Sequence, residues 1–224
     1  MKVTYNWLKD FVDIALPPVK LAEKLTMAGL EVVGLEEKGG DFIFEIEITS
    51  NRPDWLSIVG IAREVAAITG KKLKFMPTGR NRPPQNLAGS PRIMAKGSGI
   101  KIDIEDKKDC PLYTARIIKD IKVSQTPSWI KERLELVGCR SINNVVDITN
   151  YLLFELGEPL HAFDLDKLAS PSYVGIRRGR AGEKITTIDG RERLLDKDIL
   201  VIADEKKAVA VAGVMGGKET EVTE

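Results

Sequence analysis

The sequence predicts an α+β protein, with a small N-terminal α/β domain followed by a sheet-rich domain whose helices come early. Apolar residues at helical spacing run from Val19 to Met27 and stop at Gly29. A strand-like alternation follows over Phe42–Thr49, and the hairpin signal Asp189-Gly190 lies between two short β-prone runs. Helices and strands thus occupy separate stretches, as is typical of α+β folds.

The first domain is predicted over residues 1–74. Its first 33 residues read as a small helical unit with a strand at one end, and Lys38–Gly40 is a turn signal. The Phe42–Thr49 strand would have one apolar and one mostly acidic face. Ile58–Ile68 has helical spacing and ends at Gly70, a residue typical of helix C-caps.

Residues 75–98 are predicted to be a basic linker. From Lys71 to Lys101 there is no acidic residue, and prolines and glycines separate the basic ones. This composition is typical of a solvated tether between domains. A tether that also contacts RNA phosphates is the alternative, and both interpretations fit the sequence.

The second domain is predicted over residues 99–224 and alternates strand-like and helix-like pieces. Its helices are expected at Ser128–Val137 and Val145–Leu156. Its strands are expected at Ile100–Ile104, Tyr113–Ile118, Val174–Ile176, Ile199–Ile202 and Ala208–Val211. A hairpin is expected around Asp189-Gly190.

The composition excludes several classes of protein. Thirty-four basic residues nearly balance 33 acidic ones, giving a net charge of +1, which argues against a domain that binds nucleic acid through net positive charge alone. No apolar run approaches the ~18 residues of a membrane span, and the N-terminus lacks a signal-peptide pattern, so we expect a cytoplasmic protein. Cys110 and Cys139 have neither a CxxC partner nor a nearby histidine, so we expect reduced, structural thiols and no metal site.

A dense polar cluster interrupts apolar sequence at Arg140–Tyr151. On a helix, Asn143, Asp147, Asn150 and Tyr151 would share one face, which suits hydrogen bonding to a polar ligand. Alternatively, the cluster is structural: Asn143 or Asn144 caps the helix, and Asp147 pairs with Arg140.

His161 is the only histidine in the chain, so any imidazole chemistry depends on it. It is either a structural hydrogen bonder or a group that orients or deprotonates water or holds a leaving-group oxygen. Thr149 and Ser141 are conceivable nucleophiles, but no GxSxG pattern supports either. The glycine-rich Ala212–Gly217 either brings backbone N–H groups to a ligand or forms a tight turn after an edge strand.

Several of these segments together resemble the bacterial-type phenylalanyl-tRNA synthetase β subunit. Ser141–Tyr151, Glu158–Asp164 and Ala212–Gly217 are similar to its editing module. Its first domain is similar to the segments Tyr5–Lys9, Thr49–Asp54 and Gly60–Glu64. The resemblance covers nearly the whole chain in the family's order and spacing.

The resemblance implies part of the β subunit of a phenylalanine-tRNA ligase, carrying the editing site that hydrolyses tyrosine wrongly attached to tRNA(Phe). A pocket that accepts phenylalanine cannot strongly reject tyrosine, whereas a second site that hydrogen-bonds the extra hydroxyl can reject phenylalanine. The implied partners are the α subunit and tRNA(Phe), with no membrane. Editing would need no cofactor, and the complete ligase would use ATP and Mg²⁺ at sites outside this chain.

Position by position, the resemblance implies that His161 is the catalytic residue, which positions the terminal ribose or the attacking water. The resemblance also implies that Arg140, Thr149 and Asn150 hold the aminoacyl-adenosine end. The small residues Ala212 and Gly213 would leave room for the tyrosyl ring.

Two features depart from the family's pattern. Lys38–Asp41 stands where the family has an inserted tRNA-binding β-barrel, and the family's acidic residue that reads the tyrosine hydroxyl would come after Glu224. We therefore expect a truncated β subunit with an incomplete pocket and little deacylation by the chain alone. The alternatives are a freestanding trans-editing hydrolase and a non-catalytic RNA- or protein-binding module.

Overall fold

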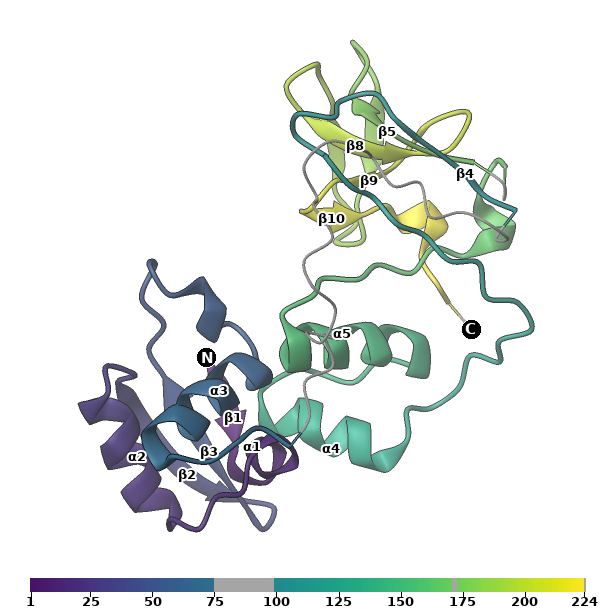
Figure 1. The fold of residues 1–224 in the computed structure, drawn as a ribbon. Helices are drawn as coiled ribbons and strands as arrows, with labels where there is room; N and C mark the ends of the chain where they lie inside the picture. The colour runs from purple at the N-terminus through teal and green to yellow at the C-terminus, as the bar shows by residue number, and fades with distance from the viewer. Residues whose placement is uncertain (75–98, 171–172, 224) are drawn as a thin grey trace. The chain divides into compact units, whose positions relative to one another are not determined.

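The computed structural model describes residues 1–74, 99–170 and 173–223, so the predicted linker 75–98 lies outside the described residues. The described residues form two compact units (Figure 1). The first comprises residues 1–74 and 124–160, and the second comprises residues 99–123, 161–170 and 173–223. Both combine helical segments with sheet, which confirms the predicted α+β class.

The first unit is built on a three-stranded antiparallel sheet with the order β1-β3-β2. The strands are β1 (Lys2–Thr4), β2 (Val32–Lys38) and β3 (Asp41–Ile46). The predicted turn between β2 and β3 is confirmed, because Gly39 and Gly40 both have the positive φ that glycine adopts without steric cost.

Helices α1 (Tyr5–Phe11) and α2 (Pro18–Met27) contact this sheet, and α3 (Ile58–Thr69) packs against both of these helices. Their apolar residues meet those of β3 in a core that includes the fully buried side chains of Trp7, Phe44 and Ile61. Helix α3 ends at Gly70, as predicted, and the glycine has φ +66°. The α3 N-cap is Ser57, whose hydroxyl accepts from the Gly60 N–H, and Pro53–Trp55 forms a short 3-10 helix before it.

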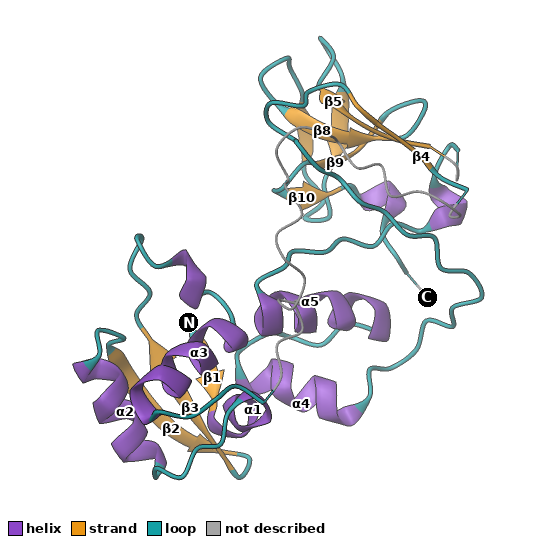
Figure 2. Cartoon of the chain, viewed as in Figure 1, coloured by secondary structure: helices purple, strands orange, loops and turns teal. Residues whose placement is uncertain are grey.

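Helices α4 (Ser128–Leu136) and α5 (Asn144–Leu156) also belong to the first unit (Figure 2). Tyr151 stacks on Trp7 at 4.8 Å between ring centroids, and Arg133 forms an ion pair with Asp10 at 2.6 Å. The compact first unit therefore includes a segment that lies within residues 99–224 of the sequence, where we placed the second predicted domain.

The second unit contains a five-stranded sheet with the order β10-β9-β8-β5-β4. Its strands are β4 (Lys101–Ile104), β5 (Tyr173–Arg178), β8 (Leu200–Ala203), β9 (Ala208–Val211) and β10 (Met215–Gly216). Strands β4 and β5 are parallel, and the other neighbours are antiparallel. Buried aliphatic side chains from β5, β8 and β9 form the main core of the unit.

A separate hairpin joins β6 (Lys184–Thr186) to β7 (Glu192–Leu194). The predicted Asp189-Gly190 turn is confirmed, and Gly190 has φ +77°. Two short 3-10 helices complete the unit: η2 (Leu165–Lys167) and η3 (Lys218–Thr220).

The predicted strand at Tyr113–Ile118 is wrong. The side chains of Tyr113, Ala115 and Ile117 pack on the core of the five-stranded sheet, while the residues between them are exposed. The segment therefore has the alternation of a strand without forming a ladder with any other described strand. Alternation reports which side chains face the core, and this extended segment buries one side by packing on the sheet.

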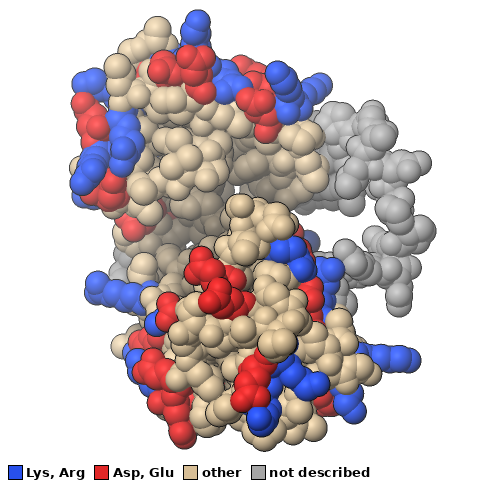
Figure 3. All heavy atoms as spheres, turned by 90° about the vertical axis from the view of Figure 1, so that its left-hand side faces the viewer, with Lys and Arg blue, Asp and Glu red and all other residues tan. Residues whose placement is uncertain are grey.

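No helix within residues 1–74, 99–170 and 173–223 combines the length and apolarity that a membrane span requires. On the face shown in Figure 3, lysine and arginine side chains intermingle with aspartate and glutamate. This mixture agrees with the nearly neutral charge of the sequence.

Candidate functional site

The N-terminus of α5 is held by Asn143. Its side-chain oxygen accepts hydrogen bonds from the backbone N–H groups of Val145, at 3.1 Å, and Val146, at 3.0 Å. These bonds satisfy two of the donors that a helix start leaves unpaired. The capping alternative for Asn143 is therefore confirmed.

Asp147 is completely buried, and both of its carboxylate oxygens accept hydrogen bonds. Its carboxylate accepts from the hydroxyls of Thr126 and Ser141, each at 2.5 Å, and from the Ile142 N–H at 2.9 Å. The alternative in which Asp147 pairs with Arg140 is wrong, because these donors already satisfy the carboxylate. Arg140 is exposed and forms no ion pair with any described residue.

Tyr151 also has a structural environment. Its ring stacks on Trp7 and meets Trp129 edge-on at 5.4 Å, and its hydroxyl accepts from Arg133 Nη1 at 2.9 Å. Burial and the adjacent Glu155 raise the pKa of Tyr151 above its ordinary value. Three of the four residues on the predicted polar face thus maintain the fold, and only Asn150 has no side-chain hydrogen bond within the described chain.

The six predicted pocket residues are divided between the two units. Arg140, Thr149 and Asn150 belong to the first unit, where the Thr149 hydroxyl donates to the Val146 carbonyl at 2.7 Å. The other three belong to the second unit and are His161, Ala212 and Gly213.

In the second unit, the imidazole of His161 lies directly against the backbone of Gly216. A Cβ placed on Gly216 would lie 2.3 Å from His161 Cε1 and 2.5 Å from Nε2, so only glycine leaves room for the ring in this position. The Phe163 ring meets the imidazole at 4.6 Å and 67°. The Asp164 N–H donates to the Thr220 carbonyl at 3.0 Å, which connects the loop of His161 to the segment after β10.

The His161 ring nitrogens have no hydrogen-bond partner among the residues that the structure describes. Contact with neighbouring atoms desolvates the exposed ring and lowers the pKa of His161 below its ordinary 6.5, while the charge of Glu221 opposes this shift. The imidazole is therefore mostly neutral at pH 7, and one of its nitrogens can accept a proton.

The glycine-rich stretch Ala212–Gly217 includes the turn from β9 into β10. Gly213 has φ +70°, and the Val214 N–H closes the turn by donating to the Val211 carbonyl at 3.1 Å. The Ala212 N–H donates to the Leu200 carbonyl at 2.9 Å. The stretch is thus a tight turn that also brings Gly216 to His161, a contact that sequence reasoning missed. The glycines themselves were the only available signal of it.

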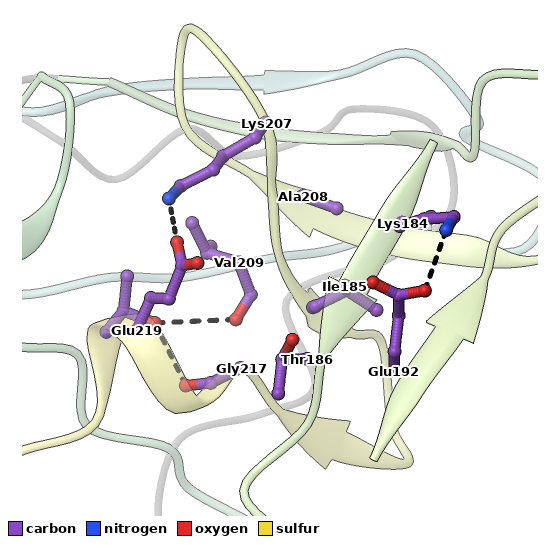
Figure 4. A pocket seen from close by; sticks show the side chains of 10 residues that line it. Lys184, Ile185, Thr186, Glu192, Lys207, Ala208, Val209, Gly217 and Glu219 are labelled. Atoms are coloured by element: carbon purple, nitrogen blue, oxygen red, sulfur yellow. Dashed lines mark hydrogen bonds and ion pairs between the residues drawn. The ribbon is translucent and has the colours of Figure 1, made fainter. Parts of the chain in front are cut away.

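Sequence reasoning also missed a cavity of about 200 Å³ in the second unit (Figure 4). Its walls come from the β6–β7 hairpin, the start of β9 and η3. The lining residues are Lys184, Ile185, Thr186, Glu192, Lys207, Ala208, Val209, Gly217, Glu219 and Thr220. No local sequence signal marks this cavity, because its walls come from segments that are distant in sequence.

The described residues contain no cluster of three or more histidine, cysteine, aspartate or glutamate side chains that could hold a metal ion. Cys110 and Cys139 are free thiols, and burial raises the pKa of each. Neither cysteine therefore has the lowered pKa of a reactive thiolate.

Comparisons with known proteins identify the family. Residues 109–224 match the model of the B3/4 domain. The chain is 50% identical over 183 residues to the phenylalanine--tRNA ligase beta subunit of Carboxydothermus hydrogenoformans, covering 81% of this chain and 21% of that protein. It is 42% identical over 230 residues to the corresponding subunit of Rhodopirellula baltica, covering 100% of this chain and 31% of that protein.

Among solved structures, the chain is similar to an N-terminal fragment of the phenylalanyl-tRNA synthetase beta-subunit from Pyrococcus horikoshii, at 16% identity and a TM-score of 0.49. The match covers 100% of this chain and 64% of that fragment. The chain spans about a fifth to a third of the length of the two curated relatives. With its B3/4 domain, the chain belongs to the phenylalanyl-tRNA synthetase β-subunit family, as its motifs predicted.

Proposed function

We propose that this chain carries the editing site of a phenylalanine-tRNA ligase β subunit and hydrolyses tyrosine from mischarged tRNA(Phe). The observation that carries the proposal is the contact between His161 and Gly216. It joins two motifs that are separated in sequence, and it supports an imidazole whose nitrogens have no partner within the described chain. Because the ring is exposed and its nitrogens are not engaged by the protein, they are available to a bound substrate or water.

The chemistry is hydrolysis of the ester between the tyrosyl carbonyl and the terminal ribose. Water attacks the carbonyl carbon, the bond to the ribose oxygen breaks, and a proton passes to that oxygen. A neutral His161 would accept the proton of the attacking water and return it to the leaving ribose, or would orient the two groups. Phe163 and Gly216 fix the plane of the ring for this task.

The remaining pocket positions have complementary roles in this proposal. Arg140 has an exposed guanidinium without an ion pair in the described chain, which suits a phosphate of the tRNA end. Thr149 and Asn150 hold the aminoacyl-adenosine group, and the small Ala212 and Gly213 leave room for the tyrosyl ring.

The proposal includes the partners of a complete ligase. An α subunit would charge tRNA(Phe) in the cytoplasm with ATP and Mg²⁺ at sites outside this chain, and the editing step needs no cofactor. We expect little deacylation by the chain alone. A robust rate from the isolated chain would favour a freestanding trans-editing hydrolase.

The direct test is His161→Ala in the complete subunit assembled with its α subunit. Deacylation of tyrosyl-tRNA(Phe) should fall by at least ~100-fold, the usual contribution of a positioned acid–base group. Phenylalanine charging should be unchanged and serves as the control for assembly. An unchanged deacylation rate would exclude His161 from the reaction.

The Gly216 contact permits a matched pair of glycine substitutions. In Gly216→Ala the new methyl group would displace the imidazole, so deacylation should fall while the subunit stays folded. Gly175→Ala is the control, because its methyl group would meet the end of the Tyr173 side chain at 2.7 Å, a similar clash elsewhere in the unit. Equal deacylation rates for the two variants would contradict the proposed role of the His161–Gly216 contact.

The pH dependence gives a further readout. If neutral His161 is the base, deacylation should decrease as the pH falls through a pKa below 6.5 and should be level above it. The residual rate of His161→Gln should lack this acidic limb. The measurement is kcat/KM for deacylation across the pH range, because this ratio reports the pKa of the substrate-free enzyme.

A further inference from the structure

The cavity of the second unit is a separate site from the contact at His161, although both involve β10 and the residue that follows it. Gly216 faces the imidazole, whereas a Cβ on the next residue, Gly217, would meet the Val209 carbonyl oxygen at 2.6 Å and Ile185 Cδ1 at 3.3 Å. Successive residues of an extended segment face opposite sides. The cavity therefore lies behind the backbone that supports His161.

The cavity has an apolar floor and one free hydroxyl. Ile185, Ala208 and Val209 line it and are buried within the unit. Thr186 is half-buried, and its hydroxyl has no hydrogen-bond partner in the described part of the chain. Figure 4 shows Thr186 between Gly217 and Ile185, with its hydroxyl turned toward the middle of the lining residues.

Two ion pairs flank this floor. Lys184 contacts Glu192 across the β6–β7 hairpin at 2.7 Å, and Lys207 contacts Glu219 of η3. Figure 4 shows the first pair on one side of the lining residues and the second pair on the other. The four side chains are 47% to 66% exposed.

Exposed ion pairs of this kind contribute ~0–1 kcal/mol each. A ligand with its own carboxylate and ammonium could therefore replace either pair at little energetic cost. We call these four side chains, Lys184, Glu192, Lys207 and Glu219, the rim of the cavity. Its two glutamates would repel a simple anion and its two lysines would repel a simple cation, so the rim favours a ligand that carries both charges.

We propose that this cavity binds a small zwitterion, an α-amino acid with a short aliphatic side chain. Its carboxylate contacts a lysine of the rim, its ammonium contacts a glutamate, and its aliphatic group lies on Ile185 and Val209. The volume of about 200 Å³ suits such a ligand, because drug-sized pockets begin at roughly 300 Å³. This site does not depend on the proposed editing function.

The test is a titration of the full 224-residue chain with L-valine, followed through the amide signals in a two-dimensional NMR spectrum. Saturable shifts are expected at Ile185, Thr186 and Val209, with a Kd on the order of 1 mM. N-acetyl-L-valine and L-valine methyl ester each lack one charge and should bind at least ~10-fold more weakly. Equal binding of the three compounds, or shifts confined to His161 and Phe163, would overturn the proposal.

Variants of the rim provide the second arm. Lys184→Gln combined with Lys207→Gln should weaken L-valine binding at least ~10-fold. Lys20→Gln removes a similarly exposed ion pair with Glu23 in the first unit and should leave binding unchanged.

If the double variant does not fold, Lys184→Gln and Lys207→Gln are measured singly, and at least one of them should weaken L-valine binding. Unchanged affinity in the folded double variant, or in both single variants, would show that the lysines do not hold the ligand.

Discussion

Two polar clusters stand out in the sequence, one at the start of α5 and one at His161, and the structure gives them opposite characters. At α5, Asn143 caps the helix and the buried Asp147 accepts three hydrogen bonds. At His161, the ring nitrogens have no partner among the described residues, and the imidazole lies against a bare glycine. In the sequence, both clusters are equally good candidates for a functional site.

The difference shows that polarity within apolar sequence does not distinguish a site from a scaffold. Burial and hydrogen-bond satisfaction together do, because a buried polar group that supports the fold must be paired, whereas an exposed group with unengaged polar atoms can reach a ligand. Stability measurements should therefore separate the two kinds of residue. Substitution of a paired group should lower the free energy of unfolding, whereas substitution of His161 should leave it nearly unchanged.

The largest effect is expected at Glu183, the most completely paired carboxylate of the second unit. It receives both ends of the Arg177 guanidinium, at 2.6 and 2.8 Å, and the N–H groups of Arg180 and Ala208, each at 2.9 Å. The two side chains are only 7% and 11% exposed. Glu183→Gln would leave the Arg177 charge buried without a counter-ion, so the free energy of unfolding at pH 7 should fall by ~3 kcal/mol.

The same ion pair predicts that the free energy of unfolding falls at acidic pH. Arg177 lowers the pKa of Glu183 from 4.5 to about 2 in the folded state, so the unfolded chain binds the proton more tightly. The stabilisation of ~3 kcal/mol is present above pH 4.5 and is lost as the pH falls toward 2. Denaturant titrations at several pH values should show a smaller decrease of the free energy of unfolding with falling pH in Glu183→Gln than in the wild type. The exposed Glu23→Gln, as control, should keep the wild-type decrease.

Asp147 should have the next largest effect. Asp147→Ala would leave two hydroxyls and the Ile142 N–H without their acceptor, and we expect the free energy of unfolding to fall by ~2–3 kcal/mol. Thr126→Val removes only one donor and should cost ~1 kcal/mol. The double variant should lose less than the sum, because Thr126 has no acceptor to lose once Asp147 is absent. Full additivity would contradict the network.

A smaller effect is expected from the helix cap. Asn143→Ala removes the acceptor for two N–H groups of α5 and should cost ~1 kcal/mol in urea denaturation. Asn143→Asp keeps the acceptor and should remain close to wild type. If both variants lose the same stability, Asn143 contributes through some other contact.

The features predicted correctly from the sequence depend on residues close together in the chain. Gly70 and Gly190 have the positive φ that their positions in a cap and a turn require, and Asn143 caps the helix that begins one residue later. Propensity and capping act within a few residues, so a sequence reveals them directly.

The features that sequence reasoning missed depend on contacts between distant segments. Residues 113–118 alternate between buried and exposed as a strand does, but no described strand pairs with them in a ladder. Asp147 could equally have paired with Arg140, and only the folded positions of Thr126 and Ser141 exclude this. The contact of His161 with Gly216 and the cavity beside Gly217 arise in the same way, from strands and loops that meet only on folding.

The smallest effect on stability is expected at His161, and this is the sharpest test of the contrast. His161→Ala removes an exposed ring whose nitrogens have no partner within the described chain, so the free energy of unfolding should change by less than ~0.5 kcal/mol. The same variant in the assembled enzyme should lose most of its tyrosyl-tRNA(Phe) deacylation. A stability loss as large as that of Asp147→Ala would place His161 with the scaffold residues, since a group kept free for a ligand contributes little to the fold.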